Sequence, residues 1–283
     1  MRRCRNHQCA GQVWSRALIG FKLLTALGVF AMLVVLAGAG EVRAEQPLNI
    51  QQLMADSGSW QIVSAVDYRT LGGPGGVVQR SAQLTGALRY GLSPRVELNA
   101  RLQSGSGTDR RGEHGRNDDF SSAAVGVNWQ LKPETTWPAL LLEGTAQLYS
   151  RFASDSAELP GAELSLTAYK SIDPVVLSLS ARYRVRRATD VDGRRYDQSY
   201  SWQLAPQVNF AVNHRVTLIG ALVLHVNEAA RVEGVRWGAT GESLALRSGL
   251  GFRMGARSTL FVSGDVVAEG GTSGVSLQWF QTL

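Results

Sequence analysis

From residue 45 onward, apolar and polar residues alternate with a period of two over most of the chain. In one clear stretch the apolar or small positions are Ala82, Leu84, Gly86, Leu88 and Tyr90, and most positions between them are polar. Successive side chains of a β-strand point to opposite faces, so this pattern predicts strands with one apolar and one polar face. Because no long stretch repeats at the helical period of about 3.6 residues, we predict an all-β protein.

The alternation divides into about twelve segments, and the connections between them alternate in length. The predicted segments are 59–70, 78–92, 95–104, 119–131, 138–151, 161–171, 175–187, 198–212, 215–227, 243–254, 258–268 and 275–283. The short connections are Leu92–Arg95, Ser171–Pro174, Val212–Arg215 and Gly255–Ser258, and the long polar ones are Gly105–Asp118, Ala153–Pro160, Ala188–Asp197 and Ala229–Glu242. Outer-membrane barrels have an even strand number, short periplasmic turns and long external loops. We therefore predict a single antiparallel transmembrane β-barrel over residues 58–283, with both termini in the periplasm.

A soluble periplasmic β-sandwich or lipocalin-like barrel would also alternate, with its apolar face turned inward. Two observations favour a membrane barrel. The polar face carries charges in the middle of strands, where a water-filled lumen would accommodate them. The predicted lumen-lining residues are Asp67, Arg69, Arg89, Glu97, Arg101, Glu143, Glu163, Arg182, Arg184, Arg186, His225, Arg247, Arg253 and Asp265. Aromatic residues sit mostly near strand ends on the apolar parity, as a membrane-interface girdle requires. The predicted girdle residues are Trp60, Tyr90, Trp129, Trp137, Tyr183, Trp202 and Trp279.

The basic character of the chain lies mainly at its N-terminus. The net charge is +6, but residues 1–44 contain six basic residues against one acid, which leaves the remainder near +1. A basic start, the apolar run Leu23–Gly38 and the small residues of Val42-Arg43-Ala44 are typical of a secretory signal peptide, so we predict cleavage after Ala44. A permanent single-pass anchor is the alternative. Without this segment the charge offers nucleic acid no basic stripe, and no nucleic-acid partner is expected.

Both cysteines, Cys4 and Cys9, fall within the predicted signal peptide, so the processed chain would have no disulfide and no thiol nucleophile. Between the signal peptide and the barrel lies a short periplasmic segment, residues 45–57. Leu48–Ala55 of this segment could form an amphipathic helix, which we hypothesise lies at or in the periplasmic mouth as a plug. The 44% content of hydrophobic residues argues against a helical membrane protein with many spans.

Two stretches resemble known barrel proteins. In Val275–Leu283 the positions Val275, Leu277, Trp279 and Leu283 are apolar to the last residue. This resembles the C-terminal strand by which the barrel-assembly machinery recognises outer-membrane proteins. That signal usually ends in Phe, whereas here Phe280 has the opposite parity and the chain ends in Leu283. The resemblance implies outer-membrane lipid and the assembly machinery as partners.

The second resemblance covers residues 58–103. The run Arg89–Leu98 reads RYGLSPRVEL, a strand, a tight turn at Pro94 and a strand that resumes its alternation at once. It is similar to a recurrent turn in outer-membrane barrels of the phenol-degradation meta-pathway type and in the related exporter barrel of functional-amyloid systems. The resemblance implies a transport role and leaves the cargo open.

No enzyme, metal or cofactor pattern is found. The His-x-Ser motif of twelve-stranded outer-membrane phospholipase is absent, and His114, His214 and His225 have no serine or acid at motif-like spacing. Asp118-Asp119 is the one candidate acid pair, at a loop–strand junction where such pairs are usually solvated. Asp190–Gly193 begins like a calcium loop but has Arg194 at the fifth position and is better explained as a turn. We predict no catalytic residue and no cofactor.

Three function classes remain open. The first is an outer-membrane channel or transporter for a small molecule or an unfolded polypeptide, with a narrow lumen lined by arginines and acids. The second is a non-conducting structural or adhesive barrel whose external loops carry recognition. The third, an enzyme, is disfavoured by the missing motifs. Within the lumen, the charges can be ion pairs that rigidify the barrel or a constriction that selects anionic or polar cargo.

Overall fold

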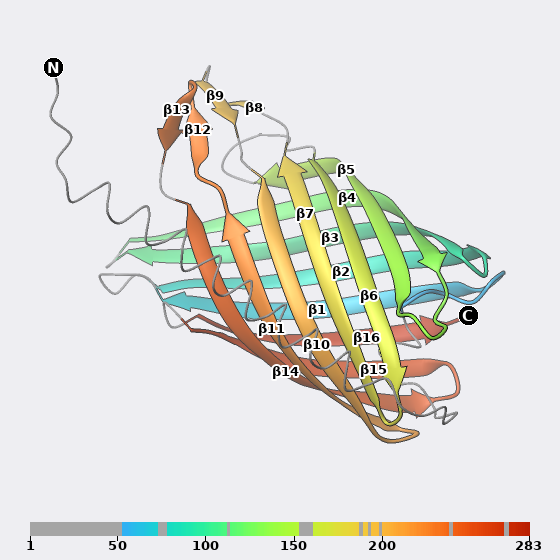
Figure 1. Cartoon of the computed structure of the whole chain (residues 1–283). Coiled ribbons are helices and arrows are strands. Elements are labelled where there is room, and N and C mark those ends of the chain that lie inside the picture. The colour runs from blue at the N-terminus through green and yellow to red at the C-terminus, as the bar shows by residue number, and fades with distance from the viewer. Residues whose placement is uncertain are drawn as a thin grey trace, which may run out of the picture. The chain divides into compact units, whose positions relative to one another are not determined.

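A computed structural model describes residues 53–72, 78–111, 114–152, 161–186, 189–191, 194–197, 200–237, 240–268 and 272–283. Within these ranges twelve strands form one closed antiparallel barrel (Figure 1). The barrel strands are β1 (Trp60–Gly72), β2 (Val78–Ser93), β3 (Val96–Arg111), β4 (His114–Lys132), β5 (Ala139–Phe152), β6 (Gly161–Ile172), β7 (Val175–Arg186), β10 (Ser201–Asn213), β11 (Val216–Asn227), β14 (Gly241–Gly255), β15 (Ser258–Val267) and β16 (Ser273–Thr282). The predicted fold class and strand number are confirmed. The predicted signal peptide, residues 1–44, lies outside the described residues.

The barrel closes where its first and last strands pair. β1 and β16 run antiparallel from Gln61 opposite Thr282 to Thr70 opposite Ser273. The backbone N–H of Leu283 also donates to the carbonyl of Trp60 at 2.9 Å. The start of β1 and the end of β16 therefore share one end of the barrel with the short connections. We call this the short-turn end and the opposite one the long-loop end.

The turns of the short-turn end follow residues 93, 132, 172, 213 and 255, as the strand bounds show. The turn between β6 and β7 contains a cis peptide bond between Asp173 and Pro174. Four of these five turns coincide with the short connections predicted from the sequence. At the long-loop end, Ala153–Pro160 lies outside the described residues, as do Asp192 and Gly193 of the predicted Asp190–Gly193 turn.

One predicted loop is wrong. Gly105–Asp118 was expected as a long polar connection, but β3 and β4 pair without interruption from Val96 opposite Trp129 to Arg111 opposite His114. The polar sequence misled the prediction because alternation arises only where the two faces of a strand meet different surroundings. A hairpin that extends past an apolar medium keeps its backbone hydrogen bonds but no longer needs an apolar face.

Two further predicted loops, Ala188–Asp197 and Ala229–Glu242, contain short strands. These are β8 (Thr189–Val191), β9 (Arg194–Asp197), β12 (Ala230–Val232) and β13 (Val235–Trp237). They form a separate four-stranded sheet in the order β13-β12-β9-β8, which lies beyond the ends of β7, β10, β11 and β14 (Figure 1). Strands of three or four residues are too short to show a period, which explains why the sequence did not reveal them.

Local hydrogen bonds hold this small sheet together. Glu233 and Gly234 both have positive φ, as the two central residues of a type I′ hairpin require. The backbone N–H of Glu233 donates to the carbonyl of Arg195 at 2.9 Å, and the Arg195 N–H donates to the Glu233 carboxylate at 2.6 Å. At the base of the sheet, a hydrogen bond with Glu228 raises the pKa of the Tyr200 hydroxyl. The two long connections are thus joined to each other.

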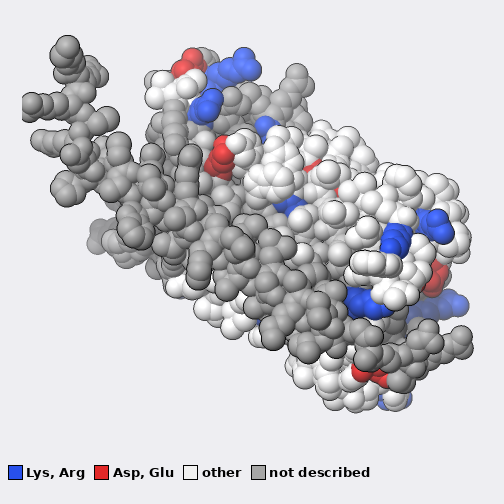
Figure 2. Space-filling view, viewed as in Figure 1, with Lys and Arg blue, Asp and Glu red and all other residues white. Residues whose placement is uncertain are grey.

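The apolar face of the barrel points outward. Leu84, Leu102, Leu148 and Leu246 are each between 58% and 67% exposed, and the same holds in lesser degree for apolar residues on nearly every barrel strand. On the face shown in Figure 2, most described charged side chains gather toward the two ends, with uncharged surface between them. A soluble β-protein would bury these residues, so the soluble alternative is wrong. The outer surface is that of a transmembrane barrel.

Among the described residues, no helix is long and apolar enough to cross a membrane.

Candidate functional site in the barrel interior

The interior of the barrel contains a central cavity of about 570 Å³. Eleven of the twelve barrel strands contribute to its wall, β6 being the exception. Six of the predicted lumen-lining residues border it: Asp67, Arg89, Arg101, Glu143, Arg182 and Arg247. Amide and hydroxyl side chains such as Gln83, Gln207 and Ser263 complete much of the remaining wall. The cavity can therefore hold water and polar solutes.

An apolar cluster interrupts this polar lining near the short-turn end. Phe261 and Phe280 meet edge to face, with ring centroids 5.5 Å apart, and Val63 packs beside them. Ala87 and Ile219 pack against the three. We call these five residues the apolar cluster. The sequence interpretation assigned every interior position to a polar face and missed the cluster, although the inward parity of Phe280 was visible.

The chain before β1 also occupies the short-turn end. We call Leu53–Ser59 the leading segment. Leu53 borders the central cavity, and Ala55 is buried. Ser57 forms a parallel bridge with Gly91 of β2, and the N–H of Gly58 donates to the Gly91 carbonyl at 2.7 Å. Of the predicted amphipathic helix Leu48–Ala55, only Leu53–Ala55 is described, and these three residues are not helical.

A buried ion pair fixes the leading segment. Arg89 Nη2 lies 2.8 Å from Glu97 Oε2, and the carboxyl group of Glu97 has no exposed surface. Glu97 Oε2 also accepts the backbone N–H of Ala55 at 2.5 Å, while Arg89 donates to the Leu53 carbonyl. Gln61 and Asn128 complete the network: Arg89 Nη1 donates to Gln61 Oε1, and Asn128 donates to Glu97 Oε1, each at 2.6 Å. Every charge of the pair is thereby paired and hydrogen-bonded.

Close backbone contact makes Gly91 part of the same arrangement. A Cβ atom at Gly91 would lie 2.1 Å from the carbonyl oxygen of Asp56. The leading segment can lie against β2 only because this position has no side chain. Arg89, Gly91 and Glu97 all belong to the RYGLSPRVEL stretch singled out from the sequence. Their arrangement could have been suspected, because Arg89 and Glu97 flank the tight turn on the same inward parity.

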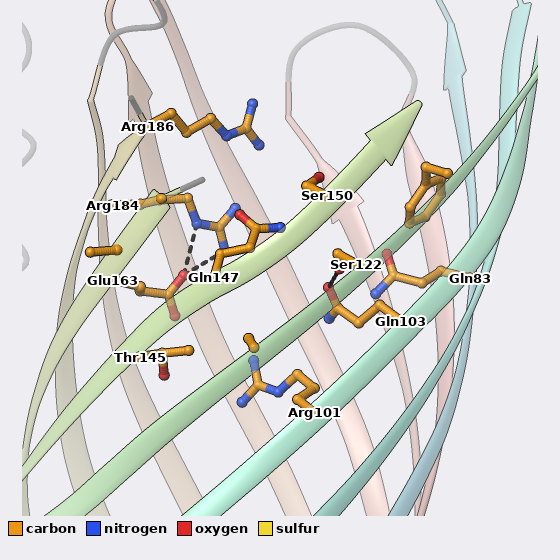
Figure 3. A pocket seen from close by; sticks show the side chains of 14 residues that line it. Gln83, Arg101, Gln103, Ser122, Thr145, Gln147, Ser150, Glu163, Arg184 and Arg186 are labelled. Carbon is orange, nitrogen blue, oxygen red and sulfur yellow. Dashed lines mark hydrogen bonds and ion pairs between the residues drawn. The ribbon is translucent and has the colours of Figure 1, made fainter. Parts of the chain in front are cut away.

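A second cavity of about 210 Å³ lies between β2 and β7, toward the long-loop end (Figure 3). We call it the arginine pocket. Arg101, Arg184 and Arg186 border it, and Glu163 is its only acid among the described lining residues. It shares Gln83, Arg101 and Gln103 with the central cavity, so the two spaces adjoin along one wall.

Glu163 is held between two arginines of β7. Arg184 Nε and Nη2 lie 2.8 and 2.5 Å from Glu163 Oε2, and Arg182 Nε lies 3.2 Å from Glu163 Oε1. On the neighbouring wall, Arg101 of β3 reaches past β4 to within 3.5 Å of Glu143 of β5. The register places Arg184 opposite Glu163 but Arg186 opposite Gly161, so no acid of β6 faces the last arginine of the row.

The other predicted lumen-lining residues are more scattered. A Cβ atom at Gly274 would lie within 3.2 Å of both Arg69 and Asp265, which therefore flank this glycine. Asp265 pairs in register with Arg247. His225 hydrogen-bonds Asn227 at 2.9 Å. Arg253 lies opposite Thr259 near the short-turn end.

The predicted girdle residues lie in two groups. Near the short-turn end are Trp60, Tyr90, Trp129, Trp137 and Trp279. Trp60 and Tyr90 stack with ring centroids 4.6 Å apart, and Trp279 Nε1 donates to Ser258 Oγ at 2.6 Å. Near the long-loop end, Tyr183 and Trp202 lie 4.4 Å apart. Their role at a membrane interface stays a prediction.

The described residues contain no group of three or more His, Cys, Asp or Glu side chains that could hold a metal ion. In β16, Val275, Leu277 and Trp279 point outward, while Phe280 belongs to the apolar cluster. Recognition of this strand by the barrel-assembly machinery stays a prediction.

Comparisons with known proteins show the fold. No family model and no curated protein matches the chain. Among solved structures, an outer membrane channel from Pseudomonas putida F1 matches with a TM-score of 0.67 at 12% identity, over 86% of this chain and 100% of that one. The transport unit of the autotransporter AIDA-I from Escherichia coli matches with a TM-score of 0.57 at 12% identity, over 90% and 97% of the two chains. The translocator domain of NalP from Neisseria meningitidis gives 0.54 at 12%, over 82% and 91%.

The resemblance to outer-membrane barrels is thus confirmed at the level of the fold. The chain has the architecture of bacterial outer-membrane channels and translocator barrels.

Proposed function

We propose that this chain is an outer-membrane channel for small polar solutes, with the central cavity as its path. The observation that carries the proposal is the polar cavity itself, which eleven of the twelve strands enclose. A volume of about 570 Å³ lies within the range of small-molecule sites, roughly 300–1,000 Å³. This favours a small solute over an unfolded polypeptide as cargo. The shared fold with an outer membrane channel supports the same proposal.

The placement in the envelope follows from this proposal. A signal peptide of residues 1–44 would direct export, and the strand Val275–Leu283 would engage the assembly machinery. The two aromatic groups would mark the two membrane interfaces. The short-turn end, with both strand termini, would face the periplasm, because outer-membrane barrels have their short turns there.

We further propose that the leading segment and the apolar cluster narrow the periplasmic mouth. Leu53 and the apolar cluster border the same cavity at the same end, and the Arg89–Glu97 pair holds the segment there. Apolar constrictions restrict ion flow because water leaves them readily. This also supports the alternative function, a non-conducting barrel in which the small sheet of β8, β9, β12 and β13 would carry recognition.

Single-channel recording in planar bilayers tests both proposals. We expect the processed chain to conduct in small steps, and a deletion of residues 45–56 to raise the conductance severalfold because it removes part of the leading segment. A shorter deletion of residues 45–50 is the matched control, since Leu53–Ser59 stays in place. Unchanged conductance in the longer deletion would contradict the proposal that the leading segment narrows the mouth.

Absence of current in all three proteins would instead favour the non-conducting barrel. On this proposal the chain is not an enzyme. Hydrolysis of lipid or peptide by the purified protein would contradict it.

A further inference from the structure

Two charged side chains on the wall of the central cavity have no partner among the described residues. Six charged residues border this cavity. Four of them belong to ion pairs, which join Arg89 to Glu97, Arg101 to Glu143 and Arg182 to Glu163. The side chains of the other two, Asp67 and Arg247, form no hydrogen bond and no ion pair within the part of the chain that the structure describes. The cavity therefore offers one free charge of each sign.

The direction of Asp265 explains why Arg247 has no partner. Asp265 stands opposite Arg247 in the pairing of β14 with β15, so the register alone would join the two. A Cβ atom at Gly274 of β16 would lie 3.0 Å from Asp265 Oδ1 and 3.2 Å from Oδ2. The carboxylate thus occupies the space above Gly274, on the side of β15 away from β14. Arg247 is left to face the cavity.

Asp67 and Arg247 come from nearby parts of the wall. β15 and β16 separate β14 from β1, and three strand spacings of about 4.8 Å place the two backbones about 14 Å apart along the wall. The register puts Asp67 level with Ser276, Ser263 and Gly249, one inward-facing position from Arg247. The long arginine side chain spans part of this distance. A small solute between the two can therefore contact a positive and a negative group at once.

An apolar surface borders the same cavity toward the short-turn end, because all five residues of the apolar cluster line it. The Phe261 ring lies over Gly251 of β14, where a Cβ atom would be 2.6 Å from its Cε1. Gly251 is four residues from Arg247 on the same strand, about 13 Å along it. Small polar side chains such as Ser263 and Ser276 line the wall between these levels. The cavity thus has free charges on one side and an apolar floor on the other.

We propose that the central cavity is a binding site for neutral amino acids with apolar side chains, and that these are solutes of the channel. Arg247 binds the carboxylate, for which its guanidinium offers paired N–H donors. Asp67 accepts from the ammonium group, and the apolar cluster contacts the side chain. A solute with one charge leaves a wall charge unpaired and binds less well. The role in transport rests on the proposed channel function, whereas the binding does not.

Fluorine NMR of the detergent-solubilised full processed chain tests the binding. The probe is para-fluorophenylalanine, and two derivatives each lack one of its charges: the N-acetyl derivative lacks the positive one and the amide lacks the negative one. We expect line broadening with the free amino acid at concentrations about fivefold lower than with either derivative, the effect of one partly exposed ion pair. Equal broadening of the three probes on the wild-type chain would overturn the proposal, whatever the variants do.

Two variants assign the two charges separately. Arg247→Gln should bind the amide as well as the free amino acid, because the carboxylate has lost its partner. Asp67→Asn should bind the N-acetyl derivative as well as the free amino acid. Since neither side chain forms a hydrogen bond or ion pair with a described residue, both variants should fold. Arg257→Gln, in the exposed turn after β14, is the matched control and should keep the wild-type order of the probes. The same wild-type order in the other two variants would overturn the assignment.

Competition tests the apolar floor. Unlabelled leucine should displace para-fluorophenylalanine at a concentration at least about tenfold lower than glycine does, because glycine has the same charged groups but no apolar side chain to bury. Equal displacement by leucine and glycine would overturn the role of the apolar cluster.

Planar-bilayer recording separates this inference from the channel proposal. Leucine should reduce the ionic current of the wild-type channel and have little effect on Arg247→Gln. Conductance without a preference for the free amino acid in the NMR experiment would overturn the binding site and leave the channel standing. Preferential binding of the free amino acid to a barrel that does not conduct would overturn the channel and leave the binding site standing.

Discussion

The two ends of the barrel interior differ in how their polar groups are accommodated. At the short-turn end, Glu97 and Arg89 are buried, and the apolar cluster fills the space beside them. At the long-loop end, Arg182 and Arg184 are about 40% exposed and share one carboxylate in the wall of an open pocket. Salt bridges occur at both ends. Only the Arg89–Glu97 pair at the short-turn end is enclosed by protein.

This difference separates two uses of the same chemistry. A buried pair must be fully hydrogen-bonded, and removal of one partner leaves a charge that water cannot reach. An exposed pair contributes little to stability, because water and salt screen it, but its field extends into the lumen. We therefore expect the short-turn end to govern stability and closure, and the long-loop end to govern selectivity.

The largest expected effect comes from Glu97→Ala. It leaves Arg89 and the backbone N–H of Ala55 without their buried acceptor, and we expect a loss of about 3–5 kcal/mol in the free energy of unfolding. Urea unfolding of the barrel in lipid vesicles measures this. The matched control is Glu143→Ala, which removes a carboxylate from the partly exposed pair with Arg101 and should cost about 1 kcal/mol or less. Equal losses of unfolding free energy in the two variants would contradict the proposed difference between the buried and the exposed ion pair.

A smaller effect is expected from Gly91→Ala, which changes no charge. The new methyl group would meet the Asp56 carbonyl, so the leading segment must move, at a cost of about 1–3 kcal/mol. Hydrogen exchange should become faster at the amides of Ala55 and Gly58. Gly86→Ala on the same strand meets nothing within 4 Å and serves as the control. Unchanged protection in Gly91→Ala would show that Gly91 does not seat the segment.

The smallest effect is expected at the outer sheet. Glu233→Ala removes the carboxylate that accepts the Arg195 amide, so this amide should exchange faster while global stability changes by less than about 1 kcal/mol. Glu233→Gln retains an acceptor oxygen and should protect the amide nearly as well. If Glu233→Ala lowered global stability as much as Glu97→Ala, the outer sheet would be part of the barrel's cooperative core.

The period of two predicted most of the fold because it shows which positions of a strand face lipid and which face the lumen. β2 was expected over 78–92 and spans Val78–Ser93, since lipid-facing and lumen-facing positions alternate along most of its length. The prediction failed where a strand continues but no longer has one apolar and one polar face. Beyond Gly105 both faces of β3 and β4 are polar, and the sequence there reads as a loop although the strands continue.

The interior was less predictable than the wall. Parity assigned Arg184 and Glu163 to the same face, but it could not show that one carboxylate would contact two arginines. Phe280 was seen as a departure from the expected C-terminal pattern, whereas its ring packs inside against Phe261. Such contacts depend on how side chains of two neighbouring strands pack together, which the apolar and polar pattern within one strand does not describe.

The position of the Arg89–Glu97 network has a consequence for biogenesis. Arg89 and Glu97, which bind the leading segment, and Gln61 and Asn128, which bind this pair, all belong to the first four strands, whereas the barrel closes only when β16 pairs with β1. The first four strands can therefore bind the leading segment before β1 and β16 pair and the barrel closes. A barrel assembled in this order would have the leading segment at its short-turn end from the moment of closure.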